Sequence, residues 1–266
     1  MTELVLRGVG LWSPGVPAWT QARELIAGHG DWPAADASRP VPSVIAANER
    51  RRAPETVLLA LAVAEQACAE AGLAPADVAS VFVSTYGDLA INHYMCSVLA
   101  EDPAQLSPTR FHNSVHNAPS GYWSIATGAM APTTSIAASH YSFATALLET
   151  AVQIRDLDAP VLLVAYDSAG QGPMASMVAS SAPFGCALLL DRAVHAGDTG
   201  ARRLRLAVRD GTCDPSPAGH PGLQAIAAAN PIARDAAGLL EAVAGAGGTC
   251  QLPLSPGLHL GVEIEP

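Results

Sequence analysis

The stretch of residues 133–156 constrains the fold most, because it leads from a short strand directly into a helix. Its first residues, TTSIAA, are small and partly β-branched, which is typical of a buried strand. Its last residues, FATALLETAVQIRD, place apolar side chains on one face and predict a helix. The tight turn between them presents residues 139–142 at a helix N-terminus, where free N–H groups and the positive end of the helix dipole converge.

A strand-to-helix turn of this kind often holds an activated nucleophile, since the helix dipole stabilises a thiolate. The turn of this chain reads SHYS and contains no cysteine. The side chains that it offers to a site are instead those of Ser139, His140, Tyr141 and Ser142.

Segments that predict strands alternate with segments that predict helices along the chain. The expected strands are residues 4–9, 78–84, 133–138, 159–165, 187–190, 203–209, 251–254 and 259–264. The expected helices are residues 54–71, 143–156 and 235–244, with Asp235 as the N-terminal cap of the last one. This alternation predicts an α/β layered fold with a mixed or parallel sheet. Function should then lie in loops at the carboxyl ends of strands, which groups Tyr86, Asp88, the segment 112–117 and the turn.

Composition narrows the classes of function. The chain has 266 residues, of which half are hydrophobic and 14% are charged, so we expect a large core or a broad apolar face that a partner covers. A formal net charge of −10 disfavours nucleic-acid binding. No apolar run reaches membrane-spanning length and the first residues lack a signal-peptide pattern, so we expect no membrane segment. Five scattered cysteines without a C-x-x-C favour a reducing cytoplasm and argue against structural zinc.

The segment of residues 106–128 is the richest in potential site chemistry. His112 and His116 are four residues apart, a spacing at which two helix side chains can share a metal ion. No third ligand is evident and prolines bracket the segment, so hydrogen bonding or interface lining is favoured over metal binding. We interpret Asn113 and Asn117 as residues that fix the loop. No cofactor is implied.

Several segments together resemble the β-ketoacyl synthases of the thiolase superfamily. They are residues 51–73, similar to the first long helix of that family; VFVSTYGD at 81–88, similar to the next strand and loop; NAPSGYWSIATGAMAPTTSI at 117–136, similar to the approach to the nucleophile; and APFGCALLLD at 182–191, similar to a late strand. The resemblance implies a thiolase-like layered fold with a largely complete N-terminal half in residues 1–195. Residues 196–266 would form a reduced C-terminal part packed on the same core.

The chain departs from the family pattern at the nucleophile. Condensing members carry a cysteine at the start of the helix that Phe143 begins here. A gap-free comparison from Pro132 places His140 at that position, and a slip of one residue would place Ser139 there. The downstream histidine motifs of the family, of the HGTGT and GHxxG types, have no counterpart. The chain therefore resembles the chain-length-factor branch, and more closely its short members from aryl-polyene-type pathways.

This resemblance implies a noncatalytic, cytoplasmic subunit that needs no cofactor. Its partners would be a Cys-bearing ketosynthase and, through that enzyme, an acyl carrier protein. The candidate tunnel or interface residues are His112, Asn113, His116, Asn117, Tyr141 and Phe143. For His140, a polar role toward a tunnel or partner and a local packing role both stay open. For Ser139 and Ser142, helix capping is favoured over a catalytic role.

Two alternatives remain open at this point. The chain could be a stand-alone serine-dependent acyl hydrolase or acyltransferase that uses Ser139 or Ser142 with His112 or His116. No orienting carboxylate for such a pair can be identified from the sequence. The chain could also be a self-associating scaffold without acyl contact, which would form a homodimer.

Overall fold

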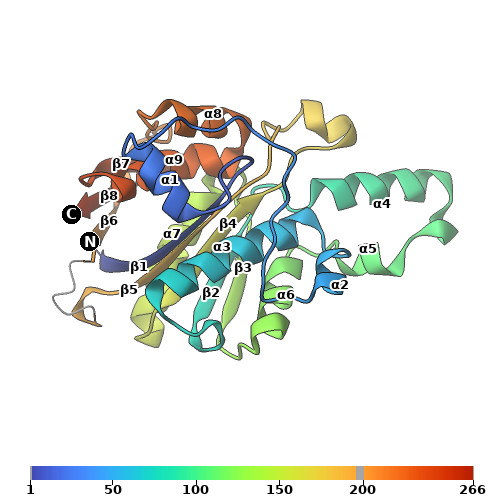
Figure 1. Cartoon of the computed structure of the whole chain (residues 1–266), viewed down its shortest axis with the longest axis horizontal. Helices are drawn as coiled ribbons and strands as arrows, with labels where there is room; N and C mark the ends of the chain where they lie inside the picture. Colours follow the sequence, from blue (N-terminus) through green and yellow to red (C-terminus); the bar gives the residue numbers. More distant parts are fainter. Residues whose placement is uncertain (1, 196–200, 266) are drawn as a thin grey trace.

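A single mixed sheet of eight strands organises the computed structural model, which describes residues 2–195 and 201–265 (Figure 1). The strand order is β3-β2-β4-β5-β1-β6-β8-β7. The strands are β1 (Thr2–Trp12), β2 (Ala79–Val83), β3 (Thr133–Ile136), β4 (Val161–Asp167), β5 (Phe184–Arg192), β6 (Arg203–Asp210), β7 (Gly248–Ser255) and β8 (Leu258–Glu265). β3, β2 and β4 are parallel, and the other pairs are antiparallel. The α/β class and the mixed sheet are confirmed.

Helices cover both faces of this sheet. α3 (Glu55–Ala71) and α6 (Ala118–Thr127) pack on one face, and α7 (Ser142–Leu157) and α9 (Pro231–Ala244) on the other. The remaining α-helices are α1 (Trp19–Ile26), α2 (Ala47–Arg50), α4 (Leu89–Glu101), α5 (Pro108–His112) and α8 (Pro221–Ala229). Figure 1 shows α4 and α5 projecting away from the sheet. No helix within the described residues is long and apolar enough to cross a membrane.

The buried helix α3 rests directly on β1. A Cβ atom on Gly8 would lie 2.2 Å from the carbonyl oxygen of Ala67, and one on Gly10 would lie 2.0 Å from that of Val63. These two glycines therefore allow a close approach of helix and strand that no larger residue would permit. α3 ends at Gly72, whose φ of 65° is the left-handed conformation that glycine adopts without strain.

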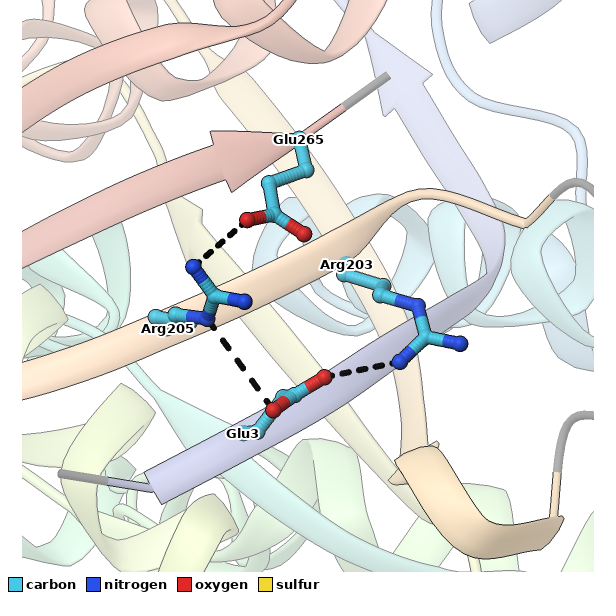
Figure 2. Close-up of polar contacts among 4 residues, drawn as sticks. All are labelled: Glu3, Arg203, Arg205 and Glu265. Carbon is cyan, nitrogen blue, oxygen red and sulfur yellow. Dashed lines mark hydrogen bonds and ion pairs between the residues drawn. The ribbon is translucent and has the colours of Figure 1, made fainter.

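The C-terminal strands join the sheet through β1. β6 pairs antiparallel with β1, and β8 pairs with β6. Figure 2 shows ion pairs across these three strands: Glu3 contacts Arg203 at 2.8 Å and Arg205 at 3.9 Å, and Arg205 contacts Glu265 at 2.6 Å. Because the side chains are partly exposed, each pair contributes at most about 1 kcal/mol. The predicted boundary at 195/196 borders residues 196–200, which lie outside the described residues.

The start of α9 differs from the prediction. Asp235 does not cap the helix; it lies one turn inside α9 and is buried. The helix begins at Pro231, and the side chain of Asn230 caps it by accepting the N–H of Ala233 at 3.2 Å. Proline is favoured at the first position of a helix, and asparagine is favoured directly before it. The helices α1, α2, α4 and α8 were also not predicted.

Candidate functional site

The turn after β3 has the predicted strand–turn–helix form. A short 3-10 turn, Ser139–Tyr141, connects β3 to α7. Ser139 has a φ of 51°, a left-handed conformation that residues other than glycine rarely adopt. Such local strain at a strand-to-helix turn is typical of positions that present a nucleophile. The side chains of Ser139 and His140 are exposed, whereas Phe143 is buried in the core on the α7 side of the sheet.

Ser142 holds this turn in shape. Its buried hydroxyl accepts the N–H of Ala138 at 2.9 Å and donates to the carbonyl oxygen of Ser139 at 2.8 Å. The side-chain cap that we expected at this helix start is absent among the described residues, since Tyr141 precedes α7 and makes no capping bond. The Ser142 hydroxyl therefore fixes the turn backbone and is not presented to a ligand.

His116 lies beside the turn, as the grouping of strand ends predicted. Its Nε2 atom is 2.9 Å from the carbonyl oxygen of Ile136, at the end of β3. Within residues 2–195 and 201–265, no hydrogen bond links a histidine to Ser139 or Ser142. The serine-dependent alternative therefore has no general base at hydrogen-bond distance in this structure.

His112 and His116 do not share a helix. α5 ends at His112, with Asn113 as its C-terminal cap, so the helical spacing that suits a shared metal ion does not apply. The described part of the chain contains no group of three or more His, Cys, Asp or Glu that could hold a metal ion. Asn113 is buried and accepts the Tyr122 hydroxyl at 3.3 Å, and the carbonyl oxygen of Asn117 accepts the Ser120 hydroxyl at 2.9 Å. The Asn113 side chain therefore connects the loop to α6, whereas Asn117 directly precedes α6 and its side chain makes no capping bond.

The α5–α6 groove is a cavity of about 490 Å³ between α2, α5 and α6. The predicted residues His112 and Asn117 both line it. Three apolar side chains of its lining are strongly exposed: Phe111 at 58%, Val115 at 52% and Ile125 at 87%. Side chains of this size, gathered on one surface, are typical of a surface that another molecule covers.

The turn cavity is a second hollow, of about 670 Å³, between the turn and the C-terminal part of the chain. His140 and Tyr141 line one side, and Cys213 and Arg234 are among the residues that face them. The guanidinium of Arg234 donates to Oδ1 of Asp235 through Nε at 3.1 Å, and its Nη2 lies 3.0 Å from the same oxygen. Burial raises the pKa of Asp235 to about 6, although the charge of Arg234 opposes this.

Sequence reasoning missed Cys213, Arg234 and Asp235. A signal was present for Asp235, which lies three residues after Ile232 and four before Leu239, on the apolar face of α9. A carboxylate at such a position must be paired, which points to Arg234.

Asp167, at the end of β4, is a further polar residue that was not predicted. Its Oδ1 atom accepts the Ser84 hydroxyl at 2.6 Å and the Thr85 N–H at 2.8 Å. Burial raises the pKa of its carboxyl to about 6. The predicted residue Asp88 is structural, because it caps α4 and accepts the Thr56 hydroxyl at 2.7 Å.

Comparison with known proteins gives a family and a fold. The model of the β-ketoacyl synthase N-terminal domain matches residues 19–234. No curated protein matches the chain. A solved ketosynthase in complex with its chain length factor from Xenorhabdus doucetiae is similar with a TM-score of 0.71 and 21% identity, over 99% of this chain and 100% of that one.

Two further structures are similar. A type II PKS acyl-carrier protein in complex with its ketosynthase gives a TM-score of 0.70 and 14% identity, over 99% of both chains. The ishigamide ketosynthase/chain length factor gives 0.60 and 16%, over 79% of this chain and 68% of that one. At these identities the likeness shows the fold, and it confirms the predicted thiolase-like layered fold.

Proposed function

Because the chain belongs to the β-ketoacyl synthase family, we propose that it is a noncatalytic chain-length-factor-type subunit that pairs with a Cys-bearing ketosynthase. The observation that carries this proposal is the turn between β3 and α7. It has the strained geometry of a nucleophile turn, but it presents Ser139 and His140 and contains no cysteine.

The cysteines elsewhere in the chain do not replace the missing one. Burial raises the pKa of Cys68, Cys186 and Cys250 to about 12. Cys96 is exposed on α4, a different element from the strand-to-helix turn. Cys213 faces the turn cavity, but partial burial and the charge of the adjacent Asp214 raise its pKa as well. A thiol whose pKa is raised is a poor nucleophile at neutral pH.

The free edge of the sheet supports pairing with another chain. β3 is one of the two edge strands, with β7 at the opposite edge, and it pairs only with β2 among the described strands, so its outer backbone groups are available to a partner strand. Met130, three residues before β3, is 94% exposed, and the α5–α6 groove lies nearby on α6. An apolar surface beside an open sheet edge suits a partner that extends the sheet and covers the groove.

In this proposal the partner ketosynthase receives acyl thioesters from an acyl carrier protein and forms the carbon–carbon bonds. This chain helps to shape the acyl tunnel, in aryl-polyene-type chain elongation in the cytoplasm. His112, Asn117 and Tyr141 are the candidate residues that line cavities. Asn113, His116 and Phe143 would act by holding the loop and the turn in place. Support comes from the solved ketosynthase–chain length factor complexes with the same fold.

Co-purification of the tagged chain from its native host tests the proposal. We expect a stoichiometric ketosynthase that carries the family cysteine. Ile125→Asp places a charge on the exposed apolar surface of the groove and should abolish recovery of that partner. Val208→Asp is the matched control, because Val208 is 49% exposed on β6, which four strands of the sheet separate from β3. Recovery of the wild-type chain alone, as a monomer or homodimer, would contradict the proposal.

Two assays on the purified chain separate the catalytic alternatives. Incubation with acyl and malonyl thioesters should give no carbon–carbon bond formation by the chain alone. Intact-mass analysis after incubation with an acyl thioester should show no adduct. A stable acyl adduct that disappears in Ser139→Ala would favour the serine-dependent alternative instead.

A further inference from the structure

The turn cavity has the build of a small-molecule site. Its volume of about 670 Å³ lies within the range usual for ligand pockets. Much of its wall consists of small or rigid apolar residues, namely Pro215, Pro217, Ala218, Ala227, Ala228 and Pro253. The rest of the lining is polar or ionisable and consists of His140, Tyr141, Cys213, Asp214, Gln224 and Arg234. Such a cavity accepts an apolar body and fixes its orientation through a few polar contacts.

Arg234 is held in place for such a contact. Its Nε and Nη2 atoms both lie within 3.1 Å of Oδ1 of Asp235, whose side chain is only 6% exposed. The carboxylate therefore fixes one edge of the guanidinium from within α9. The other edge, formed by Nη1 and the second proton of Nη2, has no acceptor within the described residues, and the side chain is 42% exposed. Two parallel N–H groups of this kind match the two oxygens of a carboxylate.

The remaining charges of the lining select the ligand further. His140 lines the cavity, and its electrostatic interaction with Asp235 lowers the pKa of that carboxyl. Asp214 also lines the cavity, and its negative charge disfavours a second anionic group or a doubly charged phosphate. The lining therefore favours a ligand with one negative charge at the Arg234 end and an uncharged apolar remainder.

We propose that the turn cavity binds a small organic monocarboxylate, whose carboxylate accepts hydrogen bonds from Arg234 while its apolar body packs on the proline and alanine walls. The proposal uses the side chains of this chain alone and does not depend on pairing with a ketosynthase.

Titration calorimetry on the purified full-length chain tests it with three probes of equal chain length: hexanoate, hexanol and hexyl phosphate. Hexanoate should bind, and hexanol should bind at least about tenfold more weakly, because it makes no charge-assisted hydrogen bond. Hexyl phosphate should also bind more weakly than hexanoate, because of Asp214. We expect hexanoate to bind more tightly than the other two probes also when the chain is in complex with a co-purified partner.

Variants assign the site. Arg234→Gln should weaken hexanoate binding by about tenfold or more. Ala228→Leu should do the same by filling the cavity while leaving the Arg234–Asp235 pair intact, so the test survives if Arg234→Gln does not fold. Arg110→Gln is the control, because that guanidinium lies 4.0 Å from the Tyr94 ring centroid, outside the cavity.

Three results would overturn the proposal. The first is equal binding of hexanol and hexanoate, which would mean that the carboxylate is not recognised. The second is hexanoate binding that Ala228→Leu leaves unchanged, which would place the ligand elsewhere. The third is tighter binding of hexyl phosphate, which would assign the cavity to phosphate esters.

Discussion

Replacing Asp167 with asparagine should stabilise the protein at neutral pH. The carboxyl of Asp167 is buried at the end of β4, and its Oδ1 accepts hydrogen bonds from Ser84 and Thr85. Its Oδ2 is buried and has no hydrogen-bond partner among the described residues. Asparagine keeps the accepting oxygen and removes the charge, so the variant isolates the effect of ionising a buried group that is only half paired.

The size of the effect follows from the pKa. Burial raises the pKa of Asp167 from 3.8 to about 6, so the folded state holds the proton more tightly than the unfolded state. The contribution of Asp167 to the free energy of unfolding is therefore most favourable below pH 3.8 and falls as the pH rises toward 6. A pKa change of one unit corresponds to about 1.4 kcal/mol. Above pH 6, ionisation of Asp167 therefore destabilises the folded protein by about 3 kcal/mol. The unpaired amide N–H of asparagine costs about 1–2 kcal/mol, which leaves a net gain of about 1–2 kcal/mol at pH 7.5.

Urea unfolding followed by circular dichroism, at pH 7.5 and pH 4.5, measures this difference. Asp167→Asn should be more stable than the wild type at pH 7.5, and the advantage should disappear at pH 4.5. Asp77→Asn, at an exposed position, is the control and should change little at either pH. The reasoning fails if the variant is less stable than the wild type at pH 7.5, or if the difference is the same at both pH values.

Two further predictions concern packing and the turn. Gly10→Ala should destabilise the protein by about 3 kcal/mol or more in urea unfolding, because the new Cβ would lie 2.0 Å from the carbonyl oxygen of Val63, whereas Gly121→Ala meets open space and should be nearly neutral. Ser142→Ala should cost about 1–3 kcal/mol, because its hydroxyl makes two hydrogen bonds that hold the turn, whereas Ser139→Ala should change the unfolding free energy by less than about 0.5 kcal/mol. Equal effects in either pair would contradict these assignments.

Most of the central fold could be predicted, because its elements carry strong local signals. The helix α3 has apolar residues on nearly all sides, a proline at its start and a glycine at its end, and the structure places it almost where expected. The apolar run of β4 was equally clear. α4 gave a weaker signal, because its apolar residues are not gathered on one buried face: only Leu89 and Ile91 are buried in the described structure.

The site was only partly predictable, because its second side comes from a distant part of the chain. The turn and His116 could be grouped from strand order alone, since both follow carboxyl ends of neighbouring strands. The contribution of Arg234 and Asp235 depends on how α9 packs against the turn. No local pattern encodes that packing, although a carboxylate on an apolar helix face indicated that a partner was required.

Asn230 explains how a short C-terminal part can still build one side of a site. Its Nδ2 donates to the carbonyl oxygens of Asp167 at 3.1 Å and Ala182 at 2.9 Å, and its Oδ1 caps α9. One buried side chain thus fixes the start of α9 to the ends of two central segments. Four residues later the same helix carries Arg234, which lines the turn cavity opposite His140. The start of α9 is therefore anchored at the carboxyl end of β4, and the turn follows the carboxyl end of β3, which runs in the same direction, so one end of the sheet holds both sides of the cavity.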